Sequence, residues 1–368
     1  MKILVQLSHP AHFHYYHYPI MNWKRDGHDV YVLIKTKDVL ETLLKEAGIS
    51  YLNINRDVHR KTKIGILWDM IVRDHRILWF CIYHKIDILT GSSAEVAHVG
   101  WLLGKSAVCT GEDDAAVVPA YVKFTSPFLQ VRLAPSSCDN GKMENKTIKY
   151  NSYHELAYLH PNQFCPSEKV VERNGIELFR PYFVFRFASL NAHHDKGIKG
   201  ITTEIAQHLI DILKPYGRIY ITSERELEPQ FEQYRIKINT LDMHHVMAFA
   251  ALYIGDSQTM AAEAGVLGVP FVRFNDFVGR IGYLNELEDV YHLGYGIKAS
   301  EQGSEEKMYE VVRGILDMPN RKEEWQARRQ KMLSEKIDYA QFLTWFIENY
   351  PESKMTMQEN PDYQYRFK

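Results

Sequence analysis

Several features that would place a protein in a special class are absent from this sequence. Its four cysteines stand far apart, at positions 81, 109, 138 and 165, with no Cys-x-x-Cys pair. This argues against a disulfide framework or a cysteine zinc site and predicts unpaired thiols in a reducing compartment. No apolar run reaches the roughly 18 residues that a membrane-spanning helix needs, and the apolar start of MKILVQLSHP is too short for a signal peptide. We therefore expect a cytoplasmic protein.

The chain also lacks an excess of positive charge. Its 44 Lys and Arg residues face 46 Asp and Glu residues, a formal net charge of -2, whereas proteins that bind nucleic acid usually present a basic face. Nucleic acid is therefore not an expected partner. Aromatic residues are abundant instead, with 23 Tyr, 17 Phe and 6 Trp. We expect most of them in the core, although such residues also line sugar-binding surfaces.

The length of 368 residues suits two domains of roughly 150 to 180 residues each. In the first half, apolar runs of the buried parallel type alternate with helical patterns, which predicts an open parallel sheet. The expected strands are 2–7, 29–35, 49–55, 87–93, 106–111 and 126–135, and the expected helices include 38–48, 63–85 and 95–104. A loop-rich stretch follows, and we expect the domain boundary near residue 165.

The second half repeats this alternation of strands and helices. Its expected strands are 181–189, 218–224, 252–257 and 270–275, and its expected helices include 203–217, 244–252, 259–268 and a long helical pattern over 304–347 interrupted at Pro319. The fold class predicted is therefore α/β, with two doubly wound, Rossmann-like domains (1–165 and 166–350) and a C-terminal helix that crosses back. The polar tail, 351–368, is expected to fray.

The stretch GDSQTMAAEAGVLG, residues 255–268, combines small polar groups with one carboxylate in an apolar helix. Ligands collect at the carboxyl ends of parallel strands, and a helix that starts there offers unpaired N–H groups to phosphate. Ser257 and Thr259 add hydroxyl groups, and Gly255 allows close approach. Glu263 lies about one turn further on, where a carboxylate can accept hydrogen bonds from the two hydroxyls of a ribose.

A simpler interpretation of the same stretch remains open. Ser257 or Thr259 can be an ordinary helix cap, and Glu263 a solvated helix residue. However, the helix is apolar on nearly every side, and a carboxylate in such a place needs a partner. We therefore favour contact with a ligand.

The pattern Asp-Ser-x-Thr-x-x-x-x-Glu followed by Gly268-x-Pro270 resembles the nucleotide-binding segment of GT-B glycosyltransferases and of the related UDP-N-acetylglucosamine 2-epimerases. More closely, nearly the whole chain resembles a family of GT-B-like proteins catalogued as a domain of unknown function, whose members are predicted glycosyltransferases. The stretches that carry this resemblance are HELAYLHPNQF (154–164), RFASLNAHHDKGIKG (186–200), ITSERELEP (221–229), HHVMAFAALYIGDSQTMAAEAGVLG (244–268) and RFNDFVGRIGYLNELE (273–288). The resemblance implies a GT-B-like fold whose two domains face a cleft.

The resemblance also implies which residues bind a nucleotide-sugar donor. Ser257, Gln258 and Thr259 are expected at the diphosphate and Glu263 at the ribose. Positive charge for a leaving diphosphate is expected from Arg186 and Lys199, because a GT-B site usually has no metal to supply it. The remaining donor-side candidates are Ser223, Glu224 and Arg225 after one strand, Asn191, His193, His194 and Asp195 after another, and Arg273, Asn275, Asp276 and Arg280 facing the cleft.

A histidine-rich loop, SHPAHFHYYH, follows the first strand, where GT-B glycosyltransferases carry a loop that faces donor or acceptor. His12 and His14 are candidate general bases or phosphate contacts, because imidazole can accept a proton near neutral pH. The alternative is that some of these histidines only pack between helices. The run of His9, His12, His14 and His17 also suggests a metal, but the resemblance speaks against one, and no metal is predicted.

The acidic turn Glu112-Asp113-Asp114 follows a strand-like segment and offers a second set of candidate bases, with Glu112 and Asp113 preferred. In the 2-epimerases a catalytic Glu follows a strand of this kind, so Glu112 resembles its counterpart. The acid that those enzymes carry after the preceding strand is replaced here by Gly91-Ser92-Ser93. This difference weighs against an epimerase, and a merely solvated acidic turn is the alternative for all three carboxylates.

The stretch from Arg56 to Lys85 is basic and rich in aromatic residues. In a transferase acting on lipid-linked acceptors, such a helix can rest on an anionic membrane surface. A half-buried amphipathic helix gives the same pattern and is the preferred interpretation, so peripheral membrane contact stays an open possibility.

Taken together, the sequence predicts a metal-independent GT-B glycosyltransferase. It would transfer a sugar from a nucleotide-diphosphate sugar, a UDP-sugar by expectation, to a glycan or lipid-linked acceptor in surface polysaccharide assembly. No cofactor is expected besides this substrate. A sugar-nucleotide epimerase on the same fold and a non-catalytic sugar-nucleotide binder are the alternatives, and the oligomeric state is left open.

Overall fold

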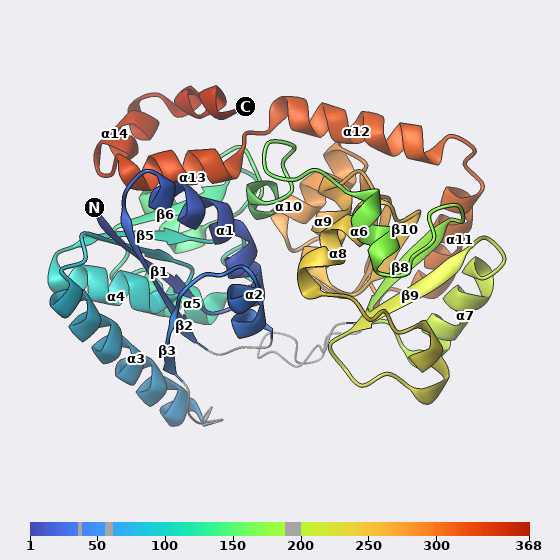
Figure 1. Cartoon of the computed structure of the whole chain (residues 1–368), viewed down its shortest axis with the longest axis horizontal. Helices are drawn as coiled ribbons and strands as arrows, with labels where there is room; N and C mark the ends of the chain where they lie inside the picture. Colours follow the sequence, from blue (N-terminus) through green and yellow to red (C-terminus); the bar gives the residue numbers. More distant parts are fainter. Residues whose placement is uncertain (36–38, 56–61, 188–199) are drawn as a thin grey trace. The chain divides into compact units, whose positions relative to one another are not determined.

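The computed structural model describes residues 1–35, 39–55, 62–187 and 200–368 (Figure 1). The chain forms two compact units. Unit 1 comprises Met1–Tyr158 and Lys336–Lys368, and unit 2 comprises Leu159–Glu335. The division after Tyr158 lies close to the boundary expected near residue 165. The C-terminal residues from Lys336 onward, however, belong to the first unit.

Unit 1 is built on a seven-stranded sheet in which every neighbouring pair of strands is parallel. The strands are β1 (Lys2–Leu7), β2 (Asp29–Lys35), β3 (Leu52–Asn55), β4 (Ile88–Gly91), β5 (Ser106–Thr110), β6 (Val131–Pro135) and β7 (Thr147–Tyr150). They lie in the order β3-β2-β1-β4-β5-β6-β7. The chain therefore reverses its direction of winding between β1 and β4, the position at which doubly wound sheets bind ligands.

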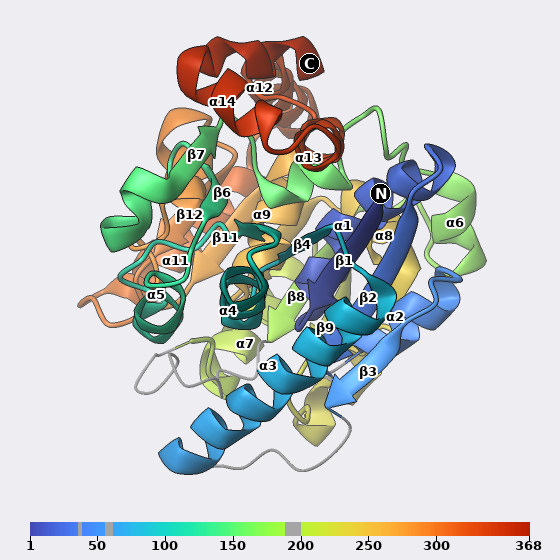
Figure 2. The same cartoon turned by 90° about the vertical axis from the view of Figure 1, so that its left-hand side faces the viewer.

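Helices cover both faces of this sheet, as the doubly wound topology requires (Figures 1 and 2). One face carries α1 (Pro10–Arg25) and α2 (Leu40–Glu46), which contact each other. The other carries α3 (Lys63–His84), α4 (Ala94–Leu103) and α5 (Pro119–Thr125), of which α4 contacts both neighbours. Because the strands are covered on both sides, they read as continuous apolar runs rather than alternating ones.

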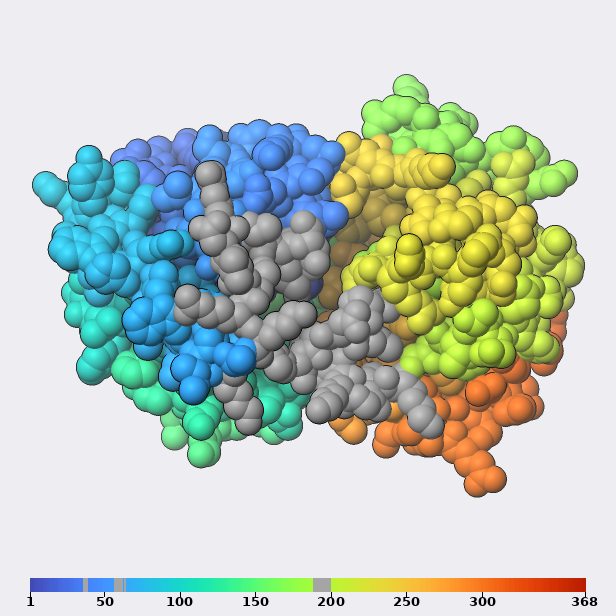
Figure 3. All heavy atoms as spheres, turned by 90° about the horizontal axis from the view of Figure 1, so that it is seen from below, coloured from blue at the N-terminus to red at the C-terminus, as the bar shows by residue number. Residues whose placement is uncertain are grey.

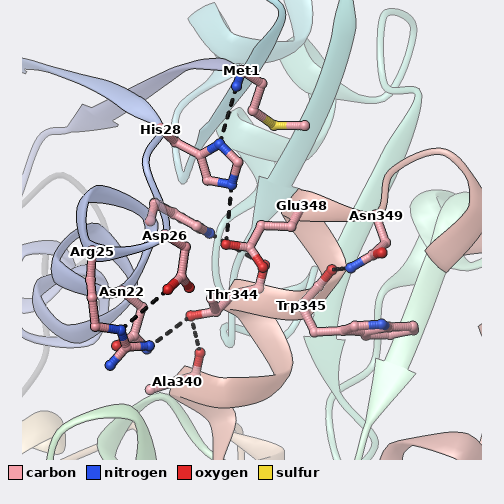
Figure 4. Close-up of polar contacts among 11 residues, drawn as sticks. Met1, Asn22, Arg25, Asp26, His28, Ala340, Thr344, Trp345, Glu348 and Asn349 are labelled. Atoms are coloured by element: carbon pink, nitrogen blue, oxygen red, sulfur yellow. Dashed lines mark hydrogen bonds and ion pairs between the residues drawn. The ribbon is translucent and has the colours of Figure 1, made fainter.

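The C-terminal segment completes unit 1. Helix α13 (Tyr339–Glu348) packs on α1, and helix α14 (Glu352–Glu359) follows it. The Thr344 hydroxyl accepts a hydrogen bond from the Asn22 amide at 3.2 Å and donates one to the Ala340 carbonyl at 2.7 Å (Figure 4). His28 Nε2 lies 3.3 Å from Glu348 Oε1. These contacts confirm that the C-terminal helix crosses back to the first unit.

Unit 2 is built on a five-stranded parallel sheet in the order β12-β11-β10-β8-β9. The strands are β8 (Tyr182–Phe187), β9 (Arg218–Ser223), β10 (Leu252–Gly255), β11 (Phe271–Phe274) and β12 (Gly294–Ile297). Its helices are α6 (Glu168–Arg173), α7 (Thr203–Leu213), α8 (Met243–Ala248), α9 (Gln258–Val266), α10 (Gly282–Asn285), α11 (Ser304–Leu316) and α12 (Arg321–Glu335). Here the winding reverses between β8 and β10.

Three local expectations differ from the structure. Strand β7 lies within the stretch expected to be a loop, and strand β12 was not expected at all. The tail after Pro351 was expected to fray, but it forms α14 and a final 3₁₀ helix, Pro361–Phe367. The tail is held by the Phe367 carbonyl, which accepts a 2.7 Å hydrogen bond from the Asp338 amide, and by the Gln364 side chain, which accepts one from the Asn151 amide at 2.6 Å.

All four cysteines are free, as expected, and only Cys165 is exposed. Among the described helices, none combines the length and apolar character needed to cross a membrane.

Candidate functional site

The best-defined candidate site lies at the carboxyl edge of the unit 2 sheet, where the winding reverses. Strands β8 and β10 are direct neighbours there, and Gly255 at the end of β10 is in register with Arg186 of β8. The segment that follows β10 runs through Asp256 and Ser257 into α9 (Figure 1). A crevice outside the strand ends at such a reversal is the usual ligand position in open α/β sheets.

Gly255 is required at this edge by close packing. A Cβ atom on this residue would lie 2.5 Å from the Tyr253 hydroxyl and 2.8 Å from the Arg186 carbonyl oxygen. Burial raises the pKa of the Tyr253 hydroxyl well above its usual range, although nearby Arg186 opposes this shift. The hydroxyl therefore stays protonated at neutral pH and can donate a hydrogen bond beside the backbone of Gly255.

The start of α9 is the accessible part of an otherwise buried helix. Ser257, Gln258 and Thr259 are partly exposed, whereas every residue from Ala261 to Val266 is buried. The Ser257 hydroxyl caps the helix by accepting a hydrogen bond from the Met260 amide at 3.5 Å. The first N–H groups of a helix point out of its N-terminus and carry partial positive charge. This geometry can hold a phosphate group, so the diphosphate role of Ser257, Gln258 and Thr259 stays a structurally reasonable prediction.

Glu263 is buried, with a relative exposure of 4%, and the protein itself supplies a partner for its carboxylate. Glu263 Oε1 lies 2.9 Å from Nε2 of His244, which comes from α8. The sequence indicated that this carboxylate needs a partner but did not identify His244, although the residue stands in the stretch HHVMAF. The contact fixes the direction of the carboxylate, and the ribose role of Glu263 stays a prediction.

Replacing His244 by alanine is expected to destabilise unit 2 by about 1–3 kcal/mol, because a buried carboxylate loses a hydrogen-bond partner. We also expect weaker nucleotide binding, since Glu263 would no longer be held in place. His244→Asn, which keeps an N–H donor, should recover part of the stability. Thermal unfolding of the two variants beside the wild type measures this, and an unchanged His244→Ala protein would show that the contact contributes nothing.

The structure brings four further predicted residues together at the ends of β8 and β9. Arg186 Nη1 donates to the Thr222 hydroxyl at 2.9 Å, and its Nη2 pairs with the Glu224 carboxylate. The Ser223 hydroxyl donates to the Arg225 carbonyl at 2.7 Å. The Arg225 guanidinium donates to the Ile201 carbonyl at 2.9 Å and lies over the Phe187 ring. Arg186 and Arg225 thus place two guanidinium groups at the carboxyl edge of this sheet, one of them paired with the Glu224 carboxylate.

The remaining residues predicted to bind the donor are not part of this group. Asn191, His193, His194, Asp195 and Lys199 lie outside the described residues. Arg280 is exposed after β11.

Arg273 was expected to face the cleft, and this is wrong. Its side chain is fully buried and lies 2.9 Å from Glu288 Oε1, because a guanidinium in the core needs a carboxylate partner. Asn275 and Asp276 are buried too and act within the loops. The Asn275 amide donates to the Asp256 carbonyl at 2.9 Å, and Asp276 Oδ1 accepts from the Ser300 amide at 2.8 Å.

In unit 1 the expected histidine loop is mostly helix. Helix α1 begins at Pro10, with the His9 ring accepting a hydrogen bond from the Ala11 amide at 3.1 Å, because proline is well suited to the first position of a helix. His12 and His14 therefore lie on a helix two residues apart and cannot face the same point. His12 Nδ1 accepts from the Ser8 amide at 3.3 Å, whereas the His14 ring lies against Tyr158. At most one of them can serve a given ligand.

The carboxyl edge of the unit 1 sheet carries a cluster of hydroxyl groups that sequence reasoning missed. The Tyr15 hydroxyl contacts the Ser92 and Thr110 hydroxyls, the latter at 3.0 Å, and Ser92 and Thr110 are 2.9 Å apart. Gly91 allows this arrangement, since its φ is 154° and a Cβ there would lie 2.5 Å from the Gln6 carbonyl oxygen. The position between β4 and β5 that lacks a carboxylate thus carries a hydroxyl network.

Glu112 lies beside this cluster, against a buried histidine. Nδ1 of His154 is 3.2 Å from Glu112 Oε2, and the His154 ring stacks on Tyr15 with ring centroids 4.1 Å apart and on Tyr339 at 5.3 Å. Burial lowers the pKa of His154 to about 3, opposed by Asp113 and reinforced by Arg132. His154 is therefore a neutral imidazole at physiological pH, and its ring lies directly against the Glu112 carboxylate.

The three carboxylates of the acidic turn have distinct environments. The Asp113 side chain is exposed, and its carbonyl accepts a 3.1 Å hydrogen bond from the buried Arg132. Asp114 is buried and accepts a hydrogen bond from the Asp139 amide at 2.8 Å, which ties two loops together. Glu112 alone stands against an imidazole, so it is the better placed of the two preferred bases. The catalytic roles of Glu112, Asp113, His12 and His14 stay predictions.

Within the part of the chain that the structure describes, no three His, Cys, Asp or Glu side chains are grouped as metal ligands would be. His9 and His12 lie near each other with ring centroids 5.9 Å apart, but the His9 ring accepts the Ala11 N–H and the His12 ring accepts the Ser8 N–H.

No family model and no curated protein sequence matches the chain. Solved structures match it over nearly its whole length. A putative UDP-N-acetylglucosamine 2-epimerase from Listeria monocytogenes is similar with a TM-score of 0.67 at 12% identity, covering 95% of this chain and 96% of that chain. S. aureus MnaA, solved with UDP, is similar with a TM-score of 0.67 at 10% identity, covering 98% and 97%.

Glycosyltransferases match as well. The spinosyn rhamnosyltransferase SpnG, solved with thymidine diphosphate, is similar with a TM-score of 0.60 at 14% identity, covering 95% of this chain and 100% of that chain. Likeness at such low identity concerns the fold. The chain has the GT-B fold, which confirms the fold class predicted from the sequence.

Proposed function

We propose that this chain is a sugar-nucleotide enzyme and, more specifically, a glycosyltransferase that uses a nucleotide-diphosphate sugar, with a UDP-sugar as the expected donor. The acceptor would be a glycan or a lipid-linked sugar. Unit 2 would bind the nucleoside diphosphate, and unit 1 would supply the base. The similar structures solved with UDP and with thymidine diphosphate support a nucleotide ligand for this fold.

The observation that carries the proposal is the carboxyl edge of unit 2. There, a glycine with no room for a side chain and the open first turn of α9 lie beside Arg186, which is paired with Glu224, at the point where the winding reverses, and Arg225 follows the neighbouring edge strand β9. A diphosphate leaving group needs positive charge and N–H donors, and this edge supplies both. Glu263, held by His244, would accept the ribose hydroxyls.

Glu112 is the proposed general base. A carboxylate that lies against a neutral imidazole can accept a proton from an acceptor hydroxyl as the new glycosidic bond forms. The Ser92 hydroxyl, the partly exposed member of the hydroxyl network at the same edge of unit 1, can bind a polar group of a sugar. Neither role requires a metal ion.

A 2-epimerase is the second candidate, because several of the similar structures are such enzymes. Against it, the segment after β4 is Gly91-Ser92-Ser93, where the resemblance leads us to expect an acid. Ser92 is instead part of the hydroxyl network with Tyr15 and Thr110. A non-catalytic binder is the third candidate.

Incubation of the purified protein with a panel of UDP-, GDP- and dTDP-sugars separates these three functions. Chromatography would detect free nucleoside diphosphate, and NMR of the sugar would detect an epimer. We expect slow release of nucleoside diphosphate from one donor, accelerated by the correct acceptor. An epimerised sugar nucleotide would establish the second candidate instead, and binding without any turnover would establish the third.

A further inference from the structure

Helix α3 presents an apolar stripe to solvent, where a surface helix ordinarily presents polar residues. The stripe follows the helical repeat through Ile64, Trp68, Ile71, His75, Trp79 and Ile82. The relative exposures of its apolar members are 83% for Ile64, 53% for Trp68, 49% for Ile71, 57% for Trp79 and 47% for Ile82. The opposite side of the helix is the one that packs on unit 1, since Arg73, Ile77 and Cys81 are buried. The helix is therefore half-buried, as expected, but its exposed side carries apolar residues where an amphipathic helix would carry polar ones.

The apolar surface extends beyond α3. Trp101 and Leu102 at the end of α4 are each 56% exposed, and Phe124 of α5 is also exposed. These three helices cover the same face of the sheet. Figures 1 and 2 show the N-terminal part of α3 projecting beyond the strands, and Figure 3 shows part of α3 (light blue) at the surface of unit 1. We call this set of exposed side chains on α3, α4 and α5 the α3–α5 face.

On the α3–α5 face, acidic side chains tend to be paired within unit 1, whereas basic side chains tend to be exposed. Two of its acidic side chains turn inward to partners within unit 1. Glu95 of α4 lies 2.6 Å from Nε of Arg73, and Asp74 lies 2.9 Å from Nδ1 of His98. The cationic side chains that remain exposed are Arg76, Lys85 and Lys123, which outnumber the exposed Asp87 and the partly buried Asp69.

We propose that the α3–α5 face docks unit 1 onto the surface of an anionic lipid bilayer. Tryptophan and tyrosine prefer the boundary between lipid headgroups and acyl chains. The face offers Trp68, Trp79 and Trp101 together with the exposed Tyr83. The surrounding lysine and arginine side chains complement anionic headgroups. The proposal concerns a surface of unit 1 and does not depend on the reaction proposed above.

Charge favours a bilayer over a second copy of this chain. A two-fold contact brings the same patch of both copies together, so the exposed lysine and arginine side chains of one copy would approach those of the other. An anionic bilayer presents the opposite sign at the same positions. An unusually large apolar patch on a protein surface usually marks an interaction site.

Flotation with lipid vesicles tests the proposal on the full chain. The probes are vesicles of phosphatidylcholine alone and vesicles that contain about one-third phosphatidylglycerol, each at low and high salt. We expect binding to the phosphatidylglycerol vesicles, weakened by salt, and a blue shift of tryptophan fluorescence. The double variant Trp68→Ser/Trp79→Ser should lower the partition coefficient about tenfold or more. Phe179→Ser in unit 2, where the side chain is 75% exposed, is the matched control and should bind like the wild type.

Three results would overturn the proposal of membrane docking, provided that the double variant folds. Because both replaced tryptophans are more than half exposed, the double variant is expected to fold, which its thermal unfolding would verify. Absence of wild-type binding to either kind of vesicle would refute the docking surface. So would equal binding of the double variant and the wild type. Sedimentation velocity that shows a wild-type dimer, a monomeric double variant and no vesicle binding would assign the face to a second copy instead.

Discussion

Replacing Glu112 by glutamine is expected to lower turnover by about 10²- to 10⁴-fold, the usual contribution of a general acid or base. The amide keeps the size of the side chain and its place beside His154, but it cannot accept a proton at neutral pH. Binding of nucleoside diphosphate should stay unchanged, because the donor site proposed for unit 2 does not include Glu112. The measurement is donor consumption at saturating substrate, together with a calorimetric titration of the same variant.

Matched replacements of two other carboxylates in unit 1 show whether the effect is specific to Glu112. Asp113→Asn should have a much smaller effect, because the Asp113 side chain is exposed to solvent. Glu144→Gln, a partly exposed carboxylate that pairs with Lys149 elsewhere in unit 1, is the control. If Glu112→Gln kept full turnover while Asp113→Asn lost it, the base would be Asp113. If both kept it, the base would be sought at His12.

The second large effect concerns how the free energy of unfolding depends on pH. Burial lowers the pKa of His154 to about 3 in the folded protein, whereas an unfolded histidine titrates near 6.5. Below about pH 6.5 the unfolded chain binds a proton that the folded chain does not, so this residue makes the protein less stable as pH falls toward 3. The slope reaches about 1.4 kcal/mol per pH unit. Between pH 7.5 and 4.5 the loss from His154 amounts to about 3 kcal/mol.

His154→Gln should remove this part of the acid sensitivity. The variant is expected to be less stable than the wild type at pH 7.5, since it loses stacking with Tyr15 and Tyr339, but the difference should shrink or reverse by pH 4.5. Denaturant unfolding at four pH values measures the difference. His208→Gln on the exposed side of α7 serves as the control. A constant difference between wild type and His154→Gln would contradict the assignment of a neutral, buried imidazole.

The fold was largely predictable because most strands of both sheets are buried on both faces. Runs such as KILVQL and DVYVLIK are apolar enough to mark β1 and β2 without any other information. Strand β7 was not predicted, because its sequence, TIKY, is short and forms the edge of its sheet. Strand β12, GYGI, contains two glycines, which are rare in strands. Both lie at sheet edges, where the apolar signal is weakest.

The candidate site was less predictable, because its side chains are partnered by residues distant in sequence. The segment after β10 could be recognised from its own residues as a helix start at a strand end. His244 and His154, the partners of Glu263 and Glu112, could not be predicted from the sequence. Each pair comes together only when separate helices and loops pack against one another. For His12 and His14 the local structure itself was predicted wrongly. Sequence placed them in a loop, and the proline that follows His9 starts a helix instead.

Calorimetric titration of UDP into the full-length protein tests the central claim, that the carboxyl edge of unit 2 binds a nucleoside diphosphate. The wild type should bind UDP, and Glu263→Gln should weaken binding about tenfold or more, because the amide keeps only one of the two acceptor oxygens that the ribose hydroxyls would use. Glu204→Gln, an exposed carboxylate of unit 2, should bind like the wild type. UDP binding to folded Glu263→Gln that is as strong as to the wild type would contradict the claim, as would wild-type protein that binds no nucleoside diphosphate at all.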